Sequence, residues 1–236
     1  MKKGNNFILF LFLFLFLLPG SIYSSSFDWT LERDENGIKV YLKEFWAEKI
    51  KAFRGVVTIN ASVDSLLAVI TDIDACTDWV QHCQNPLMLE RINFSECYHY
   101  LIHNLPFPVV NREFILYTKI SRDPASGAIT VDSVSRPDYC LQQQTPDCQF
   151  IKHSSLVRVR HSHGSYLLEP VKKRITKFTW TQHTNPGGNL PAWLVNQMIR
   201  EVPYLTLQSL RKKVTEKKYQ KARLILDSEG SIIGMD

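Results

Sequence analysis

The chain has 236 residues, 44% of them hydrophobic and 22% charged, and a formal net charge of +5. Acidic and basic residues are mixed along it, so the charge balance is too mild to predict nucleic-acid binding. It is compatible with a weak, reversible approach to anionic membranes, and the length fits one domain built from an antiparallel sheet with helices.

Residues 1–26 are predicted to be a signal peptide. A lysine pair precedes an unbroken apolar run at residues 7–18, and a segment of small residues follows. The run has about twelve residues, fewer than the roughly 20 that span a bilayer, so an uncleaved anchor is the weaker interpretation. Ser24 and Ser26 both remain candidates for the last residue of the peptide. We expect a periplasmic or secreted protein with one domain at residues 27–216.

Two alternating runs, residues 37–43 and 51–60, predict a β-hairpin. The pattern then changes to a helical period over residues 62–74, with Asn60 or Ser62 as the cap. Four strand-like runs separated by turn signals predict an antiparallel meander, and two longer runs follow. These six runs are residues 87–94, 96–105, 111–122, 127–136, 154–171 and 173–184.

Residues 189–213 predict a long amphipathic helix, with Asn189 as its cap and Pro191 in its first turn. About 25 residues give a rod of roughly 40 Å, enough to cross a small curved sheet. Pro203 removes one backbone hydrogen bond, and a hinge and a purely structural kink are both open interpretations. The helical residues expected to face an enclosed space are Val195, Met198, Ile199 and Val202. Residues 217–236 are expected to form a C-terminal tail with a frayed end.

Five cysteines follow the predicted signal peptide, and an odd count leaves at least one thiol over unless it pairs between chains. Cys140 and Cys148 flank a turn-rich segment, so a disulfide between them is the preferred pair in an oxidising compartment. Cys76 and Cys83 are an alternative pair. No cysteine has the two-residue spacing of a zinc site, and we expect neither a metal nor a cofactor.

Several segments, in this order, resemble the START domain, the lipid-transfer family related to the steroidogenic acute regulatory protein. The segments are GIKVYLK, KAFRGVVTINAS, LLAVITDIDACTDWV, LPFPVVNREF and WTQHTNPGGNLPAWLVN. The resemblance covers residues 29–213, and NREF and NPGGNLPAWLVN are its most specific parts. It implies an α+β helix-grip fold, in which a curved antiparallel β-sheet wraps around a long C-terminal α-helix and encloses an apolar tunnel for one lipid-sized or sterol-sized molecule.

The resemblance also implies a binding site without catalytic residues, gated by the C-terminal helix and a nearby loop. Arg112 matches the arginine of the family's Arg-Asp-Phe motif, with Glu113 in place of the aspartate. Inside a cavity its guanidinium needs a carboxylate or a lipid head group, and a structural salt bridge at the strand end is the alternative. His99 and His103 stand where a carboxylate is expected, and we take His103 as a candidate ligand contact.

His161 and His163 alternate in a strand-like run and share a face with Val157 and Val159. If that face lines the cavity, both histidines contact the ligand, or they bind a metal together with a third donor. The alternative is a place at the rim of the strand. We take them as candidate ligand contacts, because two histidines alone do not make a metal site.

We therefore predict a monomeric START-like protein that binds and transfers a hydrophobic molecule of the lipid or sterol class, with transient membrane contact through Trp193 and Tyr204. A helix-grip cyclase or aromatase, in which His161, His163 and Arg112 orient an enolate, is the enzymatic alternative. A non-catalytic interaction module is the third. The sequence contains no Gly-x-Ser-x-Gly elbow that would indicate a hydrolase.

Overall fold

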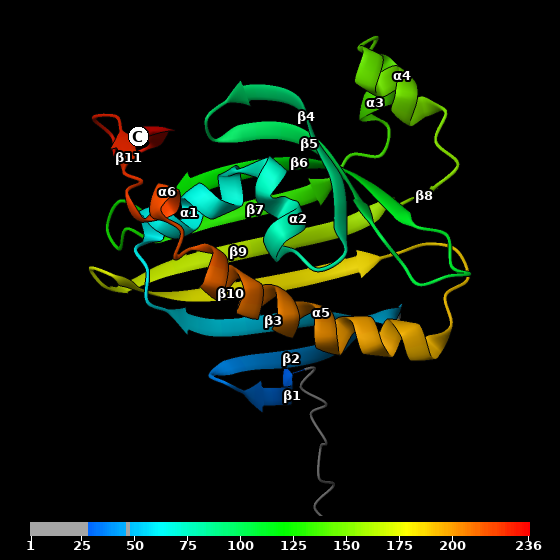
Figure 1. The fold of residues 1–236 in the computed structure, drawn as a ribbon, viewed down its shortest axis with the longest axis horizontal. Helices are drawn as coiled ribbons and strands as arrows, with labels where there is room; N and C mark the ends of the chain where they lie inside the picture. The colour runs from blue at the N-terminus through cyan, green and yellow to red at the C-terminus, as the bar shows by residue number, and fades with distance from the viewer. Residues whose placement is uncertain (1–27, 46–47) are drawn as a thin grey trace, which may run out of the picture.

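The computed structural model describes residues 28–45 and 48–236, so the predicted signal peptide lies outside the described residues. One ten-stranded sheet forms the framework of the described chain, and several of the helices cover its concave side (Figure 1). The strands of this sheet are β1 (Thr30–Glu35), β2 (Ile38–Phe45), β3 (Glu48–Ile59), β4 (Cys83–Asn93), β5 (Glu96–His103), β6 (Arg112–Arg122), β7 (Ile129–Ser135), β8 (Val157–Arg158), β9 (His161–Lys172) and β10 (Ile175–Asn185). The helices are α1 (Val63–Thr71), the 3-10 turn η1 (Ile73–Ala75), α2 (Cys76–Trp79), α3 (Tyr139–Gln142), α4 (Pro146–Lys152), α5 (Ala192–Lys213) and α6 (Lys217–Gln220).

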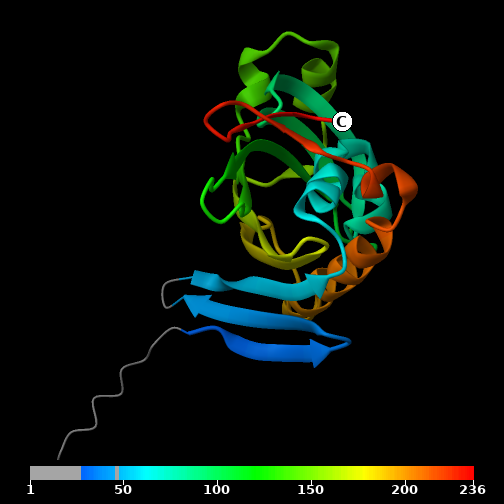
Figure 2. The same cartoon turned by 90° about the vertical axis from the view of Figure 1, so that its left-hand side faces the viewer.

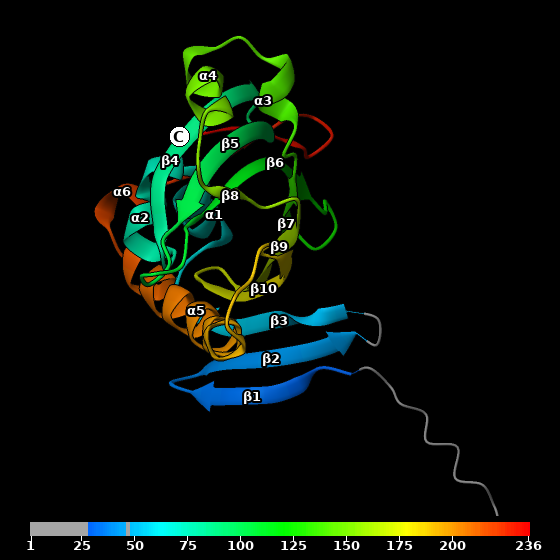
Figure 3. The same cartoon turned by 90° about the vertical axis from the view of Figure 1, so that its right-hand side faces the viewer.

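The strands follow the order β1-β2-β3-β10-β9-β7-β6-β5-β4, with every neighbouring pair antiparallel. The short strand β8 adds to β6 in parallel. Figure 3 shows the sheet curling from β1–β3 through β9 and β7 to β4 and β5, with α5 and α2 on the open side. The predicted helix-grip fold is confirmed. The edge strand β1 was not predicted, because its sequence TLERDE is mostly polar and shows no apolar alternation.

The helix α5 closes the open side of the curved sheet. It packs on β2 and β3 at one end of the sheet and on α2 at the other, and α2 in turn packs on β4. Gly55 of β3 permits the close approach, because a Cβ there would lie 2.7 Å from Cδ1 of Leu207 and 3.7 Å from Cβ of Pro203. The helix continues through Pro203, which is buried against the sheet at this contact.

The start of α5 differs from the prediction, since the helix begins at Ala192 and its N-cap is Pro191. The carbonyl of Pro191 accepts the first helical hydrogen bond, from the N–H of Leu194 at 3.0 Å. A residue that precedes proline is disfavoured in the helical conformation, so the helix cannot extend back through Leu190. The expected cap by Asn189 is therefore wrong.

The first helix begins as one of the two predicted alternatives. Ser62, rather than Asn60, caps α1, and its Oγ accepts from the N–H of Ser65 at 3.1 Å. A serine in this position satisfies one of the amides that have no partner within the helix.

The segment after α5 is folded rather than frayed. The helix α6 is followed by a hairpin of β11 (Leu224–Leu226) and β12 (Ile232–Met235), which Figure 2 shows folded back against the domain. Tyr219 is buried and its hydroxyl donates to Oδ2 of Asp72 at 2.8 Å. Ile232 is also buried, and its carbonyl accepts from Oγ of Ser95 at 2.8 Å. These contacts hold residues 217–236 on the domain.

The described cysteines form two disulfides. The predicted Cys140–Cys148 pair is confirmed, and the alternative pair Cys76–Cys83 is present as well. Cys97 is the remaining free thiol. The segment between Cys140 and Cys148, expected to be a loop, contains the end of α3 and the start of α4. Each bridge closes a short local loop, so both pairs could form together.

The helices α3 and α4 form a lobe on the outer side of β5 and β6 (Figure 1). Glu113, which is 1% exposed, holds this lobe in place: Oε1 accepts from Nε of Arg158 at 2.9 Å and Oε2 from the hydroxyl of Tyr100 at 3.0 Å. Arg158 also donates to the carbonyl of Ile151 in α4 at 2.6 Å. The salt bridge expected at this strand end therefore belongs to Glu113, the residue after Arg112.

Candidate functional site

A cavity of about 250 Å³ lies between the concave face of the sheet and the helices. Strands β3–β7, β9 and β10 supply one wall, and α5 together with the segment from Ile70 to Val80 supplies the other. The four residues of α5 predicted to face an enclosed space do line it: Val195, Met198, Ile199 and Val202. A period of 3.6 places these side chains on one face of the helix, and the sheet covers that face.

The period of two along each strand decides which residues reach the cavity. On β9, Ser162, Gly164 and Tyr166 line it. His161 and His163 alternate with them and are exposed on the opposite face, where Nε2 of His163 lies 3.9 Å from Oδ1 of Asp132. The expectation that the histidine face is the cavity face is wrong. The alternation along the strand predicted that His161 and His163 share a face, but which face of β9 is enclosed depends on the curvature of the whole sheet.

A row of polar or small residues crosses the concave face. Cys97 on β5 is opposite Thr118 on β6, which is opposite Ser133 on β7. Ser133 is opposite Gly164 on β9, which is opposite Gln182 on β10. All five residues line the cavity, so the register of five strands builds one polar band across a wall that is otherwise mostly apolar.

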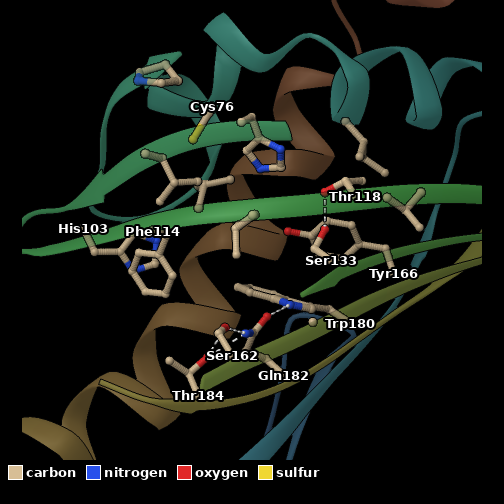
Figure 4. Close-up of a pocket in the computed structure, with 18 of the residues that line it drawn as sticks. Cys76, His103, Phe114, Thr118, Ser133, Ser162, Tyr166, Trp180, Gln182 and Thr184 are labelled. Carbon is tan, nitrogen blue, oxygen red and sulfur yellow. Dashed lines mark hydrogen bonds between the residues drawn. The ribbon is translucent and has the colours of Figure 1, made fainter. Parts of the chain in front are cut away.

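At one end of this band the polar groups satisfy one another. Nε2 of Gln182 donates to Oγ of Ser162 at 2.8 Å and to Oγ1 of Thr184 at 2.7 Å. Oε1 of Gln182 accepts from Nε1 of Trp180 at 3.3 Å. A Cβ at Gly164 would collide with this oxygen, so the glycine leaves room for the amide. Figure 4 shows Ser162, Gln182 and Thr184 together, below Trp180 in this view.

In the middle of the band the polar groups are not all paired. Oγ1 of Thr118 and Oγ of Ser133 are 2.7 Å apart and share one hydrogen bond. Tyr166 lies beside this pair in Figure 4, and its hydroxyl has no hydrogen-bond partner among the described residues. Burial raises the pKa of Tyr166, so the phenol stays protonated. These three hydroxyls therefore keep hydrogen-bonding capacity for a further molecule.

The histidines that line the cavity come from β5. His99 and His103 both face it, as expected for His103, and the His103 ring centroid lies 4.8 Å from that of Phe114. Burial lowers the pKa of each histidine to about 4. Both are therefore neutral near pH 7 and can donate or accept hydrogen bonds without contributing charge.

Arg112 lines the cavity at the point where two loops meet. Its Nε donates to the carbonyl of Pro186 at 3.2 Å, its Nη2 to the carbonyl of Gly187 at 2.8 Å, and its Nη1 to the carbonyl of Val110. Gly188 has a φ of +63°, and a Cβ there would lie 3.2 Å from Nη2. Among the described residues no carboxylate pairs with Arg112. The guanidinium therefore ties the loop after β5 to the loop before α5 through carbonyl groups.

Apolar side chains are exposed around these loops. Phe107 is 97% exposed and Trp193 61% exposed, and Trp193 shares a surface groove with Pro106. Tyr204, which was expected at the same surface, is instead buried, and its hydroxyl accepts from Nδ2 of Asn36 at 2.8 Å. Near these loops, the exposed aromatic residues thus belong to the first turn of α5 and to the loop after β5.

The residue set considered for an enolate is not assembled, since Arg112 lines the cavity and His161 and His163 lie outside it. Within residues 28–45 and 48–236 there is no group of three or more histidine, cysteine, aspartate or glutamate residues that could hold a metal.

The polar band across the concave face was not predicted from the sequence. Gly164 in the middle of a strand was the available signal, because such a glycine often marks a close approach of another group.

Comparison with known proteins identifies one matching family and several similar proteins. A family model described as START domain matches residues 20–219. An uncharacterized protein of Pseudomonas aeruginosa is 29% identical over 184 residues, which are 78% of this chain and 85% of the relative. Phosphatidylcholine transfer protein of Rattus norvegicus is 28% identical over 171 residues, which are 72% of this chain and 75% of the relative.

Solved structures show the same similarity. A structure described as a STAR-related lipid transfer protein from Xanthomonas axonopodis has 31% sequence identity and a TM-score of 0.68, and the match covers 80% of this chain and 99% of that one. Human STARD10 matches with a TM-score of 0.66 at 18% identity over 80% of this chain and 74% of its own, which shows a shared fold.

Proposed function

Because the chain belongs to the START domain family, we propose that it is a non-catalytic carrier that binds one hydrophobic molecule under α5 and transfers it through water. The observation that carries this proposal is the apolar cavity enclosed between α5 and the concave face of the sheet. Each methylene group that leaves a membrane for water costs about 0.8 kcal/mol, so a carrier must enclose the apolar part of its cargo. Relatives described as lipid transfer proteins support the same function.

Loading requires the cavity to open, and we place the gate at the two loops that Arg112 joins. Leu105 and Leu190 line the cavity from these loops, and the exposed Phe107 and Trp193 lie on them or directly beside them. Aromatic side chains favour the membrane interface, so transient contact of this surface with a membrane would bring the gate to the lipid. Separation of the loops breaks the hydrogen bonds from Arg112 to the carbonyls of Pro186 and Gly187, whereas the bond to the carbonyl of Val110 lies within one loop and remains.

We further propose that the carrier works as a monomer in the periplasm or outside the cell, after removal of residues 1–26. The two disulfides support an oxidising compartment. Among the helices of the described residues, none is both long and apolar enough to cross a bilayer.

Native mass spectrometry of the mature protein, purified from its own envelope fraction, tests the proposal. We expect a mass of one chain plus one lipid-sized molecule, which organic extraction then releases for identification. A protein that is empty, and that also takes no lipid from labelled vesicles, would refute the carrier function. That result would favour an interaction module or an enzyme.

A further inference from the structure

We propose that the cargo is an uncharged lipid, and that a hydroxyl or carbonyl oxygen of this lipid hydrogen-bonds to Thr118, Ser133 and Tyr166 on the sheet wall of the cavity. The inference rests on the proposed carrier function and narrows its ligand class. It also names the residues that recognise the polar group of the ligand.

The first argument is the hydrogen-bonding capacity that these residues leave unused. A hydroxyl group offers one hydrogen to donate and two lone pairs to accept. The single bond between Thr118 and Ser133 consumes only one of their two hydroxyl hydrogens, and within the described part of the chain Tyr166 donates its hydrogen to no other residue. All three residues line the cavity, so their spare hydrogen-bonding capacity is open to a molecule that binds there.

The second argument is the position of these hydroxyls. Thr118 and Ser133 are opposite each other on β6 and β7. Two residues before Ser133 on the same strand, Val131 is opposite Tyr166 on β9. The three hydroxyls thus come from two adjacent rows of three neighbouring strands, and Figure 4 shows them together, apart from the cluster around Gln182. The Gln182 amide already uses both of its donors and its acceptor, so it does not compete for the ligand.

The third argument is that, among the described residues, no charged group is available inside the cavity. Charged residues reach its lining at Lys51, Asp72, Arg91 and Arg112. Lys51 and Asp72 are held in ion pairs, Arg112 donates to three backbone carbonyls, and Arg91 is exposed. A phosphate group that entered this interior would lose its hydration and gain hydroxyl donors but no countercharge from the described residues, which is strongly unfavourable. The uncharged hydroxyls, in contrast, match a ligand oxygen that carries no charge.

A vesicle extraction experiment tests the ligand class. The mature protein is incubated with phosphatidylcholine vesicles that contain trace labelled dioleoylglycerol, cholesterol, dioleoylphosphatidic acid or dioleoylphosphatidylcholine, and the label bound to protein is measured after the vesicles are removed. The three dioleoyl lipids share their chains and differ only at the head group. We expect at least one of the two uncharged lipids to be extracted about tenfold or more in preference to both phospholipids.

A preference for phosphatidic acid or phosphatidylcholine would overturn the uncharged class and would leave the carrier function intact, with Arg91 as the next residue to test. Extraction of none of the four lipids, together with an empty protein in native mass spectrometry, would overturn the carrier function itself. If the purified protein carries a charged phospholipid from its own envelope, the uncharged ligand class is overturned and the carrier function remains supported.

Variants test the assigned residues. Tyr166→Phe and Thr118→Val remove a hydroxyl each and keep the shape of the side chain, so we expect binding of the preferred uncharged lipid to weaken about threefold to tenfold. Tyr41→Phe on β2 and Ser165→Ala on the outer face of β9 are matched controls and should bind like the unmodified protein.

A comparison of cholesterol with its hydrocarbon cholestene separates recognition of the hydroxyl from packing. If cholesterol is extracted, Tyr166→Phe should weaken the binding of cholesterol and leave that of cholestene unchanged. Equal weakening of both ligands, at unchanged thermal stability, would overturn the assigned role of the Tyr166 hydroxyl. If dioleoylglycerol is the lipid extracted, its analogue without the free hydroxyl replaces cholestene.

Discussion

Replacing Glu113 with alanine removes the carboxylate that joins the α3–α4 lobe to the sheet. The side chain of Glu113 is 1% exposed and accepts hydrogen bonds from Arg158 at 2.9 Å and from the hydroxyl of Tyr100 at 3.0 Å. The variant leaves Arg158 without its carboxylate and the Tyr100 hydroxyl without its acceptor. Because Arg158 keeps its hydrogen bond to the carbonyl of Ile151, the lobe stays attached but is weakened.

The size of the effect follows from the burial of the pair. Removing one partner of a buried ion pair costs about 3–5 kcal/mol. The side chain of Arg158 is 22% exposed, so water offsets part of its lost pairing and we expect about 3 kcal/mol of lost unfolding free energy. In a domain of this size each kcal/mol lowers Tm by about 2–4 °C, so Tm should fall by roughly 6–12 °C.

Urea unfolding followed by tryptophan fluorescence, together with a thermal scan, measures this change. Glu169→Ala is the matched control, because Glu169 pairs with Lys177 at 2.8 Å on the exposed surface, where such a pair contributes at most about 1 kcal/mol. If Glu113→Ala loses no more free energy than this control, the buried carboxylate does not hold the lobe and the reasoning is refuted.

Three further predictions follow from α5 and the cavity wall. Met198→Trp should fill the cavity and reduce lipid uptake from labelled vesicles to near background at normal stability. Gln208→Trp, on the exposed face of α5, is the control and should take up lipid normally. Equal uptake by both variants would contradict the cavity assignment. Gly55→Ala should lower the free energy of unfolding in urea by about 1–3 kcal/mol, because the new methyl group meets Leu207; no change would mean that the helix shifts freely. The free energy of unfolding of the unmodified protein should decline as pH falls from 6.5 to about 4. In this range the unfolded chain protonates His99, whereas the folded protein keeps it neutral. A pH series of thermal scans should show a weaker decline for His99→Leu.

Local periodicity was sufficient to predict most elements. The steps of three and four in α5 identified Val195, Met198, Ile199 and Val202 as residues of one covered face, and all four line the cavity. The alternating runs matched most of the strands in the sheet. Both patterns depend on residues a few positions apart, which share a face in any helix or strand whatever the rest of the chain does.

The signals that failed depend on contacts between distant parts of the chain. The tail after α5 gains its order from the burial of Tyr219 and Ile232 against other elements, which no local pattern reports. The partners of Arg112 are backbone carbonyls, and any residue type can supply a carbonyl. The resemblance to a family supplied the fold and the position of Arg112, but it did not supply these contacts.

The sequence by itself determined the order of most helices and strands, the covered face of α5 and the preferred disulfide, because periodicity and short-range spacing encode them, and its resemblance to a family supplied the helix-grip fold. Only the tertiary structure decided which face of β9 is enclosed, and it placed Tyr166 inside and His163 outside. It also decided that Thr118 and Ser133 meet across two strands. The physical reason is that alternation fixes which side chains point together, whereas the curvature and register of the whole sheet fix where they point.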